Sequence, residues 1–500
     1  MFSSQNEQDN RYYGKLSGLP VLEPSSIDEA REMARYGFEL SEKLQEPVIL
    51  RTTTRINHSS GIVTLGPIEK PRPKGTFVKD PENLVCVPAV SRKLHVKLLE
   101  NIEKAEVLSD ASAYNFMEGS GEYGVVCNGV SYGYVVDGIR ELGVEDKTRI
   151  LRIGFSNPMP DQQIKTFLSA CSKVLVVEEG EPVMEDYLKA VAHEARLEPE
   201  IAGKSKTLFS RLYEYDPAMV KDRIASYFGF DYSAPPKPDL SDIPEIPQRP
   251  PTLCAGCSHR STYHIIKTAA EGMDTIYPSD IGCYTLGYLP PLQMADFVVC
   301  MGSSVGTSCG FSAASDQKVI SFIGDSTFFH TGVPGLINAV FNNHNFTLVI
   351  LDNRTTAMTG HQPNPGVDME ELNFPGYGQV DIEQLVKAIG VPQVSVINPY
   401  NIKKSIDIVK QALEFKGVSV VIAKKKCTLF AQSLKQLKKD RAFTINENCT
   451  NDRDCINLIA CTAFYIDDDQ VQINPDICVG CSTCMQICSE KAIVPLKRDK

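Results

Sequence analysis

Short apolar runs alternate with amphipathic segments between residues 123 and 195. Residues 123–127 (YGVVC), 149–153 (RILRI) and 173–179 (KVLVVEE) are rich in branched aliphatic side chains, which predicts buried strands. Apolar positions recur with a helical period in the segments that follow each run, 131–142, 161–172 and 184–195. This alternation of strands and helices predicts a βαβα unit with a parallel sheet.

A second region of the same kind covers residues 252–430. Residues 319–323 (VISFI) and 347–351 (TLVIL) are short apolar runs of the type found in central parallel strands. Residues 333–343 between them predict a crossover helix. The proline-dense stretch 232–251 separates the two regions and predicts a linker. The chain is therefore predicted to be a multidomain α/β protein.

The start of the chain carries one predicted helix and one predicted strand. Residues 26–44 have a helical apolar period, with Ser26 as the expected N-cap and Glu29 three residues later. Residues 47–53 (PVILRTT) predict a buried strand. One helix and one strand cannot cover both faces of a parallel sheet. Either this segment docks on another chain, or the chain lacks its natural beginning.

The remaining segments are less regular. Residues 64–92 are proline-rich and are expected to be irregular, and a helical period follows over 94–108. Residues 431–439 (AQSLKQLKK) predict a basic helix that leads into a cysteine-rich tail.

Composition and charge narrow the class of protein. The 500 residues are enough for about three domains. The chain is 42% hydrophobic and 23% charged, as is usual for a soluble globular protein. A net charge of -11 argues against a nucleic-acid partner, because phosphate binding needs clustered Lys and Arg. The polar start and the lack of long apolar runs predict no signal peptide and no membrane helix, hence a cytoplasmic protein.

Sixteen cysteines in such a chain are not expected to form a disulfide framework. Cys478, Cys481 and Cys484 have C-x2-C-x2-C spacing, and Cys488 follows after three residues, as in the bacterial ferredoxin run. There the last cysteine serves a second cluster, so the first three need an upstream ligand, for which Cys461 is the candidate. The alternative, a zinc knuckle, is disfavoured because zinc sites usually pair two separated C-x2-C hairpins.

The second cluster departs from this pattern at one position. Its ligands would be Cys449, residue 452, Cys455 and Cys488, and residue 452 is Asp. A carboxylate oxygen is a harder ligand than thiolate and holds iron less well. A [3Fe–4S] cluster, an Asp452-ligated [4Fe–4S] cluster and an empty site all stay open.

Polar residues follow the two apolar strands of the second region. Gly324, Asp325 and Ser326 come after the first strand, and Asn353 comes 28 residues after Asp325, at the end of the second. A right-handed βαβ unit brings both strand ends to one edge of the sheet, where ligands of open α/β sheets bind. Asp325 and Asn353 could hold Mg²⁺, and a glycine beside them lets a diphosphate approach the backbone. This spacing matches the thiamine diphosphate signature, with the Thr355 carbonyl as the third protein ligand of the metal.

Two further positions are candidates in the same region. Gly302 and Ser303 precede another predicted helix and could contact thiamine diphosphate, although close helix packing explains a glycine there equally well. His361 is a candidate proton carrier, because histidine titrates near neutral pH. The alternative role of His361 is hydrogen-bonded positioning.

Four segments together carry a family resemblance. GDSTFFHTGVPGLINAV, ILDNRTTAMTGHQPNPG, LCAGCSHRSTYH and SDIGCYTLGYLPP resemble the α subunit of indolepyruvate:ferredoxin oxidoreductase, one of the thiamine-dependent 2-oxoacid:ferredoxin oxidoreductases. The resemblance covers essentially the whole chain. It implies six segments: a remnant of the pyrimidine-binding domain (1–63), an irregular linker (64–92), an α/β domain like the transketolase C-terminal domain (93–231), a Pro-rich linker (232–251), the thiamine diphosphate- and Mg²⁺-binding domain (252–430) and an α+β bacterial-ferredoxin-like 4Fe–4S domain (431–500).

The resemblance also implies a reaction and its partners. An arylpyruvate such as indole-3-pyruvate would lose CO₂ at thiamine diphosphate, electrons would pass through iron–sulfur clusters to ferredoxin, and coenzyme A would take the acyl group. A smaller β subunit would complete the enzyme. Family members carry roughly a hundred residues ahead of this chain's first residue, including the Glu that activates the aminopyrimidine. The catalytic acid/base is therefore unassigned, and little turnover is expected from this chain alone.

Four scattered cysteines gain a role through the same resemblance. Related oxidoreductases place a C-x2-C pair, a later Ile-Gly-Cys and one distant cysteine around a cluster close to thiamine. Cys254, Cys257, Cys283 and Cys427 fit that order. The alternative is that they are structural thiols, because cysteine is among the most often buried residue types. One to three clusters are therefore expected.

Three rival functions stay open. An oxidoreductase for pyruvate or a branched-chain 2-oxoacid would use the same motifs with a different pocket shape. A non-oxidative thiamine-dependent decarboxylase would not need the C-terminal clusters. A stand-alone electron carrier would not need a metal–diphosphate site.

Overall fold

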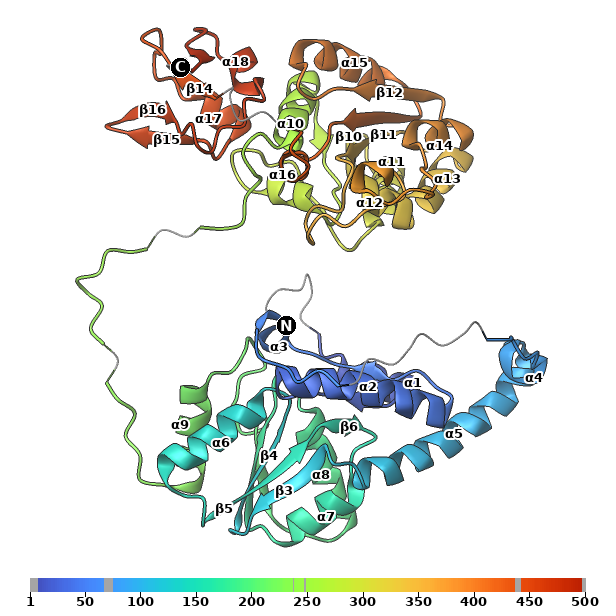
Figure 1. Cartoon of the computed structure of the whole chain (residues 1–500), viewed down its shortest axis with the longest axis vertical. Coiled ribbons are helices and arrows are strands. Elements are labelled where there is room, and N and C mark those ends of the chain that lie inside the picture. Colours follow the sequence, from blue (N-terminus) through green and yellow to red (C-terminus); the bar gives the residue numbers. More distant parts are fainter. Residues whose placement is uncertain (1–7, 67–74, 237, 247–248, 437–441, 497–500) are drawn as a thin grey trace. The chain divides into compact units, whose positions relative to one another are not determined.

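The chain divides into two units, Met1–Ile243 and Pro244–Lys500, whose boundary lies inside the proline-dense stretch 232–251. The computed structural model describes residues 8–66, 75–236, 238–246, 249–436 and 442–496. Each unit contains its own parallel sheet (Figure 1). The protein is therefore a mixed α/β protein built on more than one parallel sheet.

The main sheet of the N-terminal unit has the strand order β3-β5-β4-β7-β8. Its strands are β3 (Asn115–Gly119), β5 (Thr148–Ile153), β4 (Tyr123–Asn128), β7 (Lys173–Val177) and β8 (Glu200–Ala202). β4 pairs in parallel with both β5 and β7, which confirms the predicted parallel sheet. β3 is an antiparallel edge strand that the apolar pattern did not predict.

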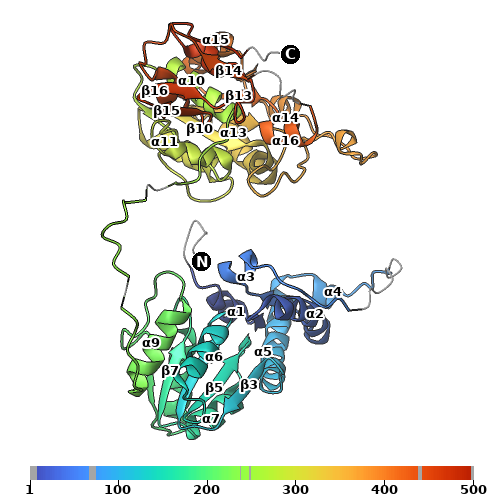
Figure 2. The same ribbon diagram turned by 60° about the vertical axis from the view of Figure 1, so that its left-hand side comes forward.

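Helices cover both faces of this sheet because its strands bury alternate side chains on opposite sides. Val125 and Cys127 pack against α6 (Ser131–Leu142) and α9 (Pro217–Phe228). Val126 packs against α7 (Asp161–Ser169) and α8 (Val183–Glu194). α6 and α9 lie side by side in both views (Figure 1, Figure 2). The predicted helices over 131–142 and 184–195 are confirmed, whereas the helix predicted over 161–172 ends at Ser169.

The start of the chain forms a second, smaller sheet with the order β2-β1-β6. Its strands are β2 (Ile49–Leu50), β1 (Val21–Leu22) and β6 (Phe155–Asn157). The segment thus packs on its own unit. Neither of the two alternatives drawn from the sequence, docking on another chain or a missing beginning, included this arrangement. The strand predicted over 47–53 shrinks to two residues, because its only strand partner among the described residues is the equally short β1.

Helix α2 (Ile27–Leu44) fixes this segment. Its N-cap is Ser26, whose hydroxyl accepts a hydrogen bond from the Glu29 N–H at 3.2 Å, as predicted. The Glu29 carboxylate turns instead to Ser25 and to Arg152 of the neighbouring sheet. Other short helices here are α1 (Arg11–Ser17), α3 (Thr54–His58) and α4 (Pro81–Leu84).

Helix α5 (Pro88–Asp110) begins six residues earlier than the period over 94–108 predicted. Pro88 sits in the first turn, where its fixed φ and missing N–H suit a helix start. The interval 64–92 is therefore not wholly irregular, and the helix runs across the expected domain boundary at 92/93. Residues 67–74 of that interval lie outside the described residues.

A buried ion-pair network ties the N-terminal segment to the main sheet of its unit. Arg11 contacts Asp9 and Glu178, each at 2.5 Å, and all three side chains are at most 2% exposed. Arg51 pairs with Glu23 in the same region. Burial alone would raise the pKa of Asp9, but the hydrogen bond and charge of Arg11, with Arg51, lower it to about 2. Glu178 lies directly after β7, so the network links the first helix to an interior strand of the sheet.

The C-terminal unit contains a five-stranded sheet that is entirely parallel, with the order β12-β13-β11-β10-β9. Its strands are β12 (Gln393–Ile397), β13 (Val418–Lys424), β11 (Phe346–Asp352), β10 (Lys318–Gly324) and β9 (Thr275–Ile276). The two predicted central strands are β10 and β11, and the predicted crossover helix is α13 (Val333–Phe341), so this part of the prediction is confirmed.

Helices again lie on both faces of the sheet. α10 (Ser258–Ala269) and α15 (Ile402–Glu414) pack on one face. α11 (Ser303–Ala314), α13 and α14 (Ile382–Ala388) pack on the other. The short helix α12 (Asp325–Thr327) starts immediately after β10. The carboxyl edge of the sheet is left for the loops that follow each strand.

Two similar halves make up residues 442–496. In the first half β14 (Phe443–Ile445), α17 (Asp454–Ile459) and β15 (Phe464–Asp467) follow in order. In the second half the order is β16 (Gln470–Ile473), α18 (Thr483–Ile487) and β17 (Ile493–Pro495). β14 pairs with β17 and β15 with β16, both antiparallel. The connector before them is the helix α16 (Thr428–Ser433), which starts and ends earlier than predicted for 431–439; residues 437–439 lie outside the described residues.

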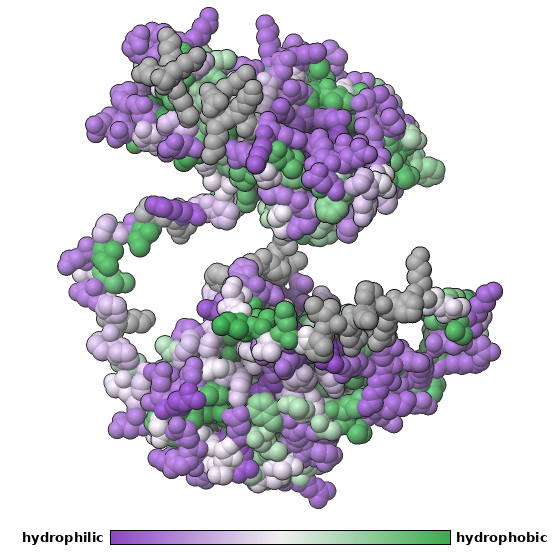
Figure 3. Space-filling model, viewed as in Figure 1, coloured by the Kyte–Doolittle hydropathy of each residue, from purple (hydrophilic) through white to green (hydrophobic). Residues whose placement is uncertain are grey.

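In the described part of the chain, no helix is both long and apolar enough to span a bilayer. The faces seen in Figure 3 are mostly hydrophilic, with hydrophobic residues in separate patches. The apolar side chains are concentrated in the cores described above.

The buried network generates a stability prediction. Arg11→Ala would leave Asp9 and Glu178 buried without their cation, and we expect the free energy of unfolding of the N-terminal unit to fall by about 3–5 kcal/mol. The measurement is hydrogen exchange of the β4 and β7 amides, which reports on this unit alone. Arg35→Ala is the control, because its pair with Glu39 is 72% and 60% exposed and should change stability by less than about 1 kcal/mol. Equal effects of the two substitutions would contradict the role given to the network.

Candidate active site

The carboxyl ends of β10 and β11 lie next to each other at one edge of the parallel sheet. The register pairs Gly324 with Leu351, so Asp325 and Asn353 follow adjacent strand ends. Asp325, Asn353 and Thr355 are all buried, and the Asn353 side chain accepts a hydrogen bond from the Thr355 N–H at 3.2 Å. The structure thus brings together the three residues that the sequence suggested as Mg²⁺ ligands.

Asp325 has the properties expected of a cation ligand. Its Oδ2 atom is buried and has no hydrogen-bond partner among the described residues. Burial, followed by the nearby Asp352 carboxylate, raises the pKa of Asp325 to about 7. A divalent cation would supply the missing positive charge and the missing partner. The donor set of one carboxylate, one amide oxygen and one backbone carbonyl therefore fits Mg²⁺, with remaining positions for phosphate oxygen and water.

Neighbouring side chains pack closely against Gly324 and Gly302 beside this edge. A Cβ on Gly324 would lie 2.7 Å from the Tyr284 ring, and a Cβ on Gly302 would lie 1.8 Å from Thr331 Oγ1. Gly302 also has a φ of +87°, which a side chain rarely adopts. Ser303 hydrogen-bonds within its own turn, to the Cys300 carbonyl at 2.8 Å. Close packing therefore explains Gly302 structurally.

Three residues that the sequence reasoning did not single out build the walls of this site. Asp280 is fully buried and accepts hydrogen bonds from the N–H groups of Ile281, Gly302 and Ser304, at 2.8, 2.7 and 3.0 Å. Tyr284 donates its hydroxyl to the Ile281 carbonyl at 3.1 Å. Asn364 lies close enough to affect the pKa of Asp325, and its own Nδ2 has no partner among the described residues. The only sequence signal for Asp280 and Tyr284 was their place in SDIGCYTLGYLPP.

His361 lies in the loop after β11 and shows two unusual features. Its φ of +66° is uncommon for a non-glycine residue and marks a strained backbone. Its ring stacks on Phe430 at 5.8 Å, and its Nδ1 atom is buried without a partner among the described residues. An unpaired imidazole nitrogen held in place by stacking is available to a ligand.

Cys254, Cys257, Cys283 and Cys427 lie near one another although they span over 170 residues of sequence. Burial is the main cause that raises the pKa of Cys257 to about 12, and the nearby thiols of Cys427 and Cys283 raise it further. Burial is also the main cause that raises the pKa of Cys283 to about 11, and the thiols of Cys427 and Cys254 add to it. The Cys427 N–H donates to the Asn353 carbonyl at 2.8 Å. This set, here called the proximal thiols, is therefore joined directly to the candidate Mg²⁺ edge.

The C-terminal cysteines separate into two sets that match the sequence assignment. Burial and the thiols of Cys481, Cys461 and Cys478 raise the pKa of Cys484. Burial, Cys449, Asp452 and Cys488 raise the pKa of Cys455, to about 11. These four residues also line one small cavity. Asp452 Oδ1 accepts a hydrogen bond from the Asp454 N–H at 3.0 Å, which leaves Oδ2 without a hydrogen-bond partner in the described part of the chain.

Within the described ranges, no three His, Cys, Asp or Glu side chains are close enough together to hold a single metal ion. A cluster is larger than one ion, so its thiolate ligands stand further apart. The candidate ligands fall instead into three sets of four.

Contacts join the proximal thiols to the first C-terminal set. Gly256, with a φ of +64°, packs so closely that an added Cβ would lie 2.1 Å from Val479. Arg260 is 1% exposed and donates to the carbonyls of Cys254 (3.1 Å), Ile459 (3.1 Å) and Ala460. Ala460 immediately precedes Cys461. A buried cation thus holds the two cysteine loops together.

A family model matches part of this unit. The family described as "Thiamine pyrophosphate enzyme, C-terminal TPP binding domain" matches residues 280–423. That range contains β10, β11 and the residues of the candidate Mg²⁺ edge.

Curated relatives match nearly the whole chain. A protein of Methanothermobacter thermautotrophicus named "Indolepyruvate oxidoreductase subunit IorA" is 45% identical over 504 residues, which cover 99% of this chain and 80% of that protein. A protein of the same name from Archaeoglobus fulgidus is 42% identical, with the same two coverages. The chain therefore spans about four fifths of the length of these relatives.

A third relative matches only a short stretch. A protein of Hydrogenibacillus schlegelii named "Ferredoxin 7Fe" is 33% identical over 54 residues, which cover 10% of this chain and 69% of that protein.

The raised pKa of Asp325 predicts how cofactor binding depends on pH. Below pH 7 the carboxyl is protonated, so a cation must displace a proton, and above pH 7 it need not. We expect the affinity for Mg²⁺–thiamine diphosphate to rise about tenfold per pH unit up to pH 7 and then to level off. Calorimetric titration at pH 6, 7 and 8 measures this. Asp325→Asn should weaken binding and abolish the pH dependence, whereas Asp316→Asn, an exposed control, should retain both; an unchanged Asp325→Asn profile would remove Asp325 from the site.

Proposed function

The chain belongs to the family of indolepyruvate oxidoreductase subunit IorA, and from this membership we propose that it catalyses the oxidative decarboxylation of an arylpyruvate such as indole-3-pyruvate. It is an enzyme subunit of the thiamine diphosphate-dependent class. In the proposed reaction the bond between the keto carbon and the carboxylate breaks and a bond to the sulfur of coenzyme A forms. The products are the aryl-acetyl thioester, CO₂, one proton and two electrons.

One observation carries this proposal. The Cys427 N–H donates to the carbonyl of Asn353, so one residue of the proximal thiols is in direct contact with a candidate Mg²⁺ ligand. A decarboxylase that releases an aldehyde needs no electron acceptor beside its cofactor. A stand-alone electron carrier needs no buried carboxylate with an unsatisfied oxygen. The junction of both features favours an oxidoreductase over either rival.

The cofactor is thiamine diphosphate, which when bound supplies the electron sink for loss of CO₂. Asp325, Asn353 and the Thr355 carbonyl would hold Mg²⁺. Gly324 and Ser326 stay candidates for contact with the diphosphate. The Ser326 N–H donates to Asp325 Oδ1 at 2.8 Å and its hydroxyl accepts a hydrogen bond from Thr356 at 2.9 Å, which fixes Ser326 beside the candidate metal ligand. Gly302 and Ser303 stay candidates for contact with the thiamine.

His361 is proposed as a proton carrier at this site. Its Nδ1 atom is free of partners in the described structure, and Phe430 fixes the ring. A neutral imidazole could take the proton released from the coenzyme A thiol. Burial lowers the pKa of His259 to about 4, which makes His259 too weak a base for this role near neutral pH.

Electrons would leave through three iron–sulfur sites in sequence. The proximal thiols come first, because Cys427 touches the candidate active site. Cys461, Cys478, Cys481 and Cys484 come next, because Gly256 packs on Val479 and Arg260 bridges the two loops. Cys449, Asp452, Cys455 and Cys488 come last. Residues 431–500 would thus act as a ferredoxin-like domain that delivers electrons to a separate ferredoxin.

The relative named "Ferredoxin 7Fe" supports a proposal for the site of Cys449, Asp452, Cys455 and Cys488. Its name counts seven irons, which equals one three-iron and one four-iron cluster. We infer that Cys449, Cys455 and Cys488 hold a [3Fe–4S] cluster, with Asp452 beside the open corner.

Activity with the β subunit tests the function. The chain expressed with its β subunit should reduce methyl viologen with indole-3-pyruvate only when coenzyme A is present. We expect Asp325→Asn to lower the rate at least about 100-fold, because the metal anchors the diphosphate. Asp316→Asn should stay near wild type. Release of an aldehyde without dye reduction would favour the decarboxylase, and a preference for pyruvate or a branched-chain 2-oxoacid would replace the substrate while keeping the reaction.

Iron content and paramagnetic resonance test the clusters. Two four-iron clusters and one three-iron cluster give about eleven irons per chain, with a three-iron signal in the oxidised protein. Asp452→Cys should convert that signal to a four-iron one and add about one iron, because it supplies the missing thiolate. Asp454→Cys is the control and should change neither. A four-iron signal in the wild type that Asp452→Ala leaves unchanged would show that Asp452 is no ligand.

A further inference from the structure

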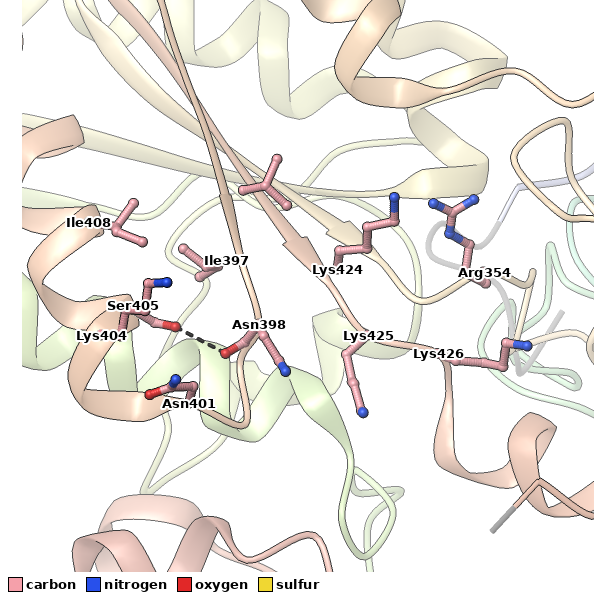
Figure 4. Close-up of a pocket in the computed structure, with 11 residues that line it drawn as sticks. Arg354, Ile397, Asn398, Asn401, Lys404, Ser405, Ile408, Lys424, Lys425 and Lys426 are labelled. Carbon is pink, nitrogen blue, oxygen red and sulfur yellow. Dashed lines mark hydrogen bonds between the residues drawn. The ribbon is translucent and has the colours of Figure 1, made fainter.

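A basic pocket of about 550 Å³ opens beside the candidate active site. Figure 4 shows the side chains that line it arriving from two directions. Arg354 comes from the loop after β11, and Lys424 to Lys426 come from the end of β13 and the loop after it. Asn401 is the N-cap of α15, and Lys404 lies in its first turn. Its volume lies in the range of small-molecule sites.

The charge in this pocket is one-sided. Five cationic side chains line it and no carboxylate does. Arg354, Lys424 and Lys426 have acidic partners outside the pocket, Asp352 at 3.2 Å, Asp381 at 4.0 Å and Glu371 at 2.5 Å. Lys404 and Lys425 have no carboxylate partner in the described part of the chain. In a protein with a net charge of -11, such a concentration of cations points to an anionic ligand.

The first turn of α15 adds backbone donors. The helix has 13 residues, and its N-cap Asn401 makes no capping hydrogen bond through its side chain. The Ile402 N–H is taken by Gln486 Oε1 at 3.1 Å, whereas those of Lys403 and Lys404 have no partner among the described residues. Free N–H groups at a helix start, together with nearby lysines, form a phosphate site.

The pocket is adjacent to the candidate cofactor site but distinct from it. None of its lining residues is a candidate ligand of Mg²⁺. The Lys425 N–H donates to the Asp352 carbonyl at 2.9 Å, one residue before Asn353. Val396, Ile397 and Ile408 give one apolar wall. A ligand whose phosphates are held here could extend toward the Mg²⁺ edge along the ends of β13 and β11.

We propose that this pocket binds the phosphate groups of a nucleotide-type ligand. Its concave form fits a small molecule better than the surface of an acidic protein. The proposal rests on the proposed function in one respect: the phosphate-bearing substrate there is coenzyme A. A free nucleotide carries the same chemistry and is the other source of such a ligand.

The test is direct binding to the full chain, with Mg²⁺ and thiamine diphosphate at saturation so that the cofactor site is filled. The probes are coenzyme A, pantetheine, which lacks the nucleotide and its phosphates, and ATP, which lacks the pantetheine. Lys404→Glu/Lys424→Glu reverses two charges in the pocket. Lys410→Glu/Lys416→Glu makes the same change on exposed lysines that do not line it.

We expect coenzyme A to bind, pantetheine to bind at least tenfold more weakly, and the pocket variant to lose at least tenfold in affinity for coenzyme A. The control variant should change the affinity by less than threefold. Equal affinity for ATP would keep the phosphate site and assign it to a nucleotide. Coenzyme A affinity that is unchanged in the pocket variant would overturn the proposal. Because binding is measured without turnover, a result here stands apart from the outcome of the activity assay.

Discussion

β10 and β11 pair in parallel, so both strands end at the same edge of the sheet. This pairing places a carboxylate and an amide side by side at the carboxyl edge of the sheet. Apolar strands on both sides bury that edge, and burial leaves Asp325 with one oxygen unsatisfied and a raised pKa. A fold that keeps such a group without a counter-charge is destabilised unless a cation binds. Binding of Mg²⁺ with a diphosphate would supply the partner and the positive charge that the buried Asp325 carboxylate lacks.

The same sheet edge organises the redox part. β13 pairs with β11 on the side away from β10, so Cys427, which follows β13, comes to lie against Asn353. The loop that carries Cys254 and Cys257 is held beside it, because Tyr400 and Thr428 both donate to the Gly256 carbonyl. The buried Arg260 side chain joins this loop to the segment before Cys461, because it donates to the carbonyls of Cys254 and Ala460. Chemistry and electron removal would thus share one rigid scaffold.

The sequence predicted those features that local patterns encode. The apolar runs of β10 and β11, the crossover helix and the Ser26 cap each leave a signature within a few residues, and all were confirmed. β3 was missed because four of its five residues lie wholly or partly exposed at a sheet edge, so it has no apolar run. The start of α5 and the short strands of the first sheet depend on packing partners far away in sequence.

The site divides in the same way. Asp325 and Asn353 were visible because each follows an apolar strand, but Asp280 and Asn364 act through contacts that only the fold creates. The grouping of Cys254 with Cys427 could not follow from spacing and came from family resemblance. Lys424 to Lys426 are a visible run, yet only the fold adds Arg354 and Lys404 to form a pocket.

In the proposed function, decarboxylation at this sheet edge delivers electrons to clusters held by the same chain. The most direct measurement is rapid-freeze paramagnetic resonance of the complex with its β subunit, mixed with indole-3-pyruvate in the absence of any external electron acceptor. We expect substrate alone to produce the signals of reduced clusters, and the Asp325→Asn variant, which lacks the proposed metal-binding carboxylate, to produce none. Consumption of the substrate while every cluster stays oxidised would contradict it.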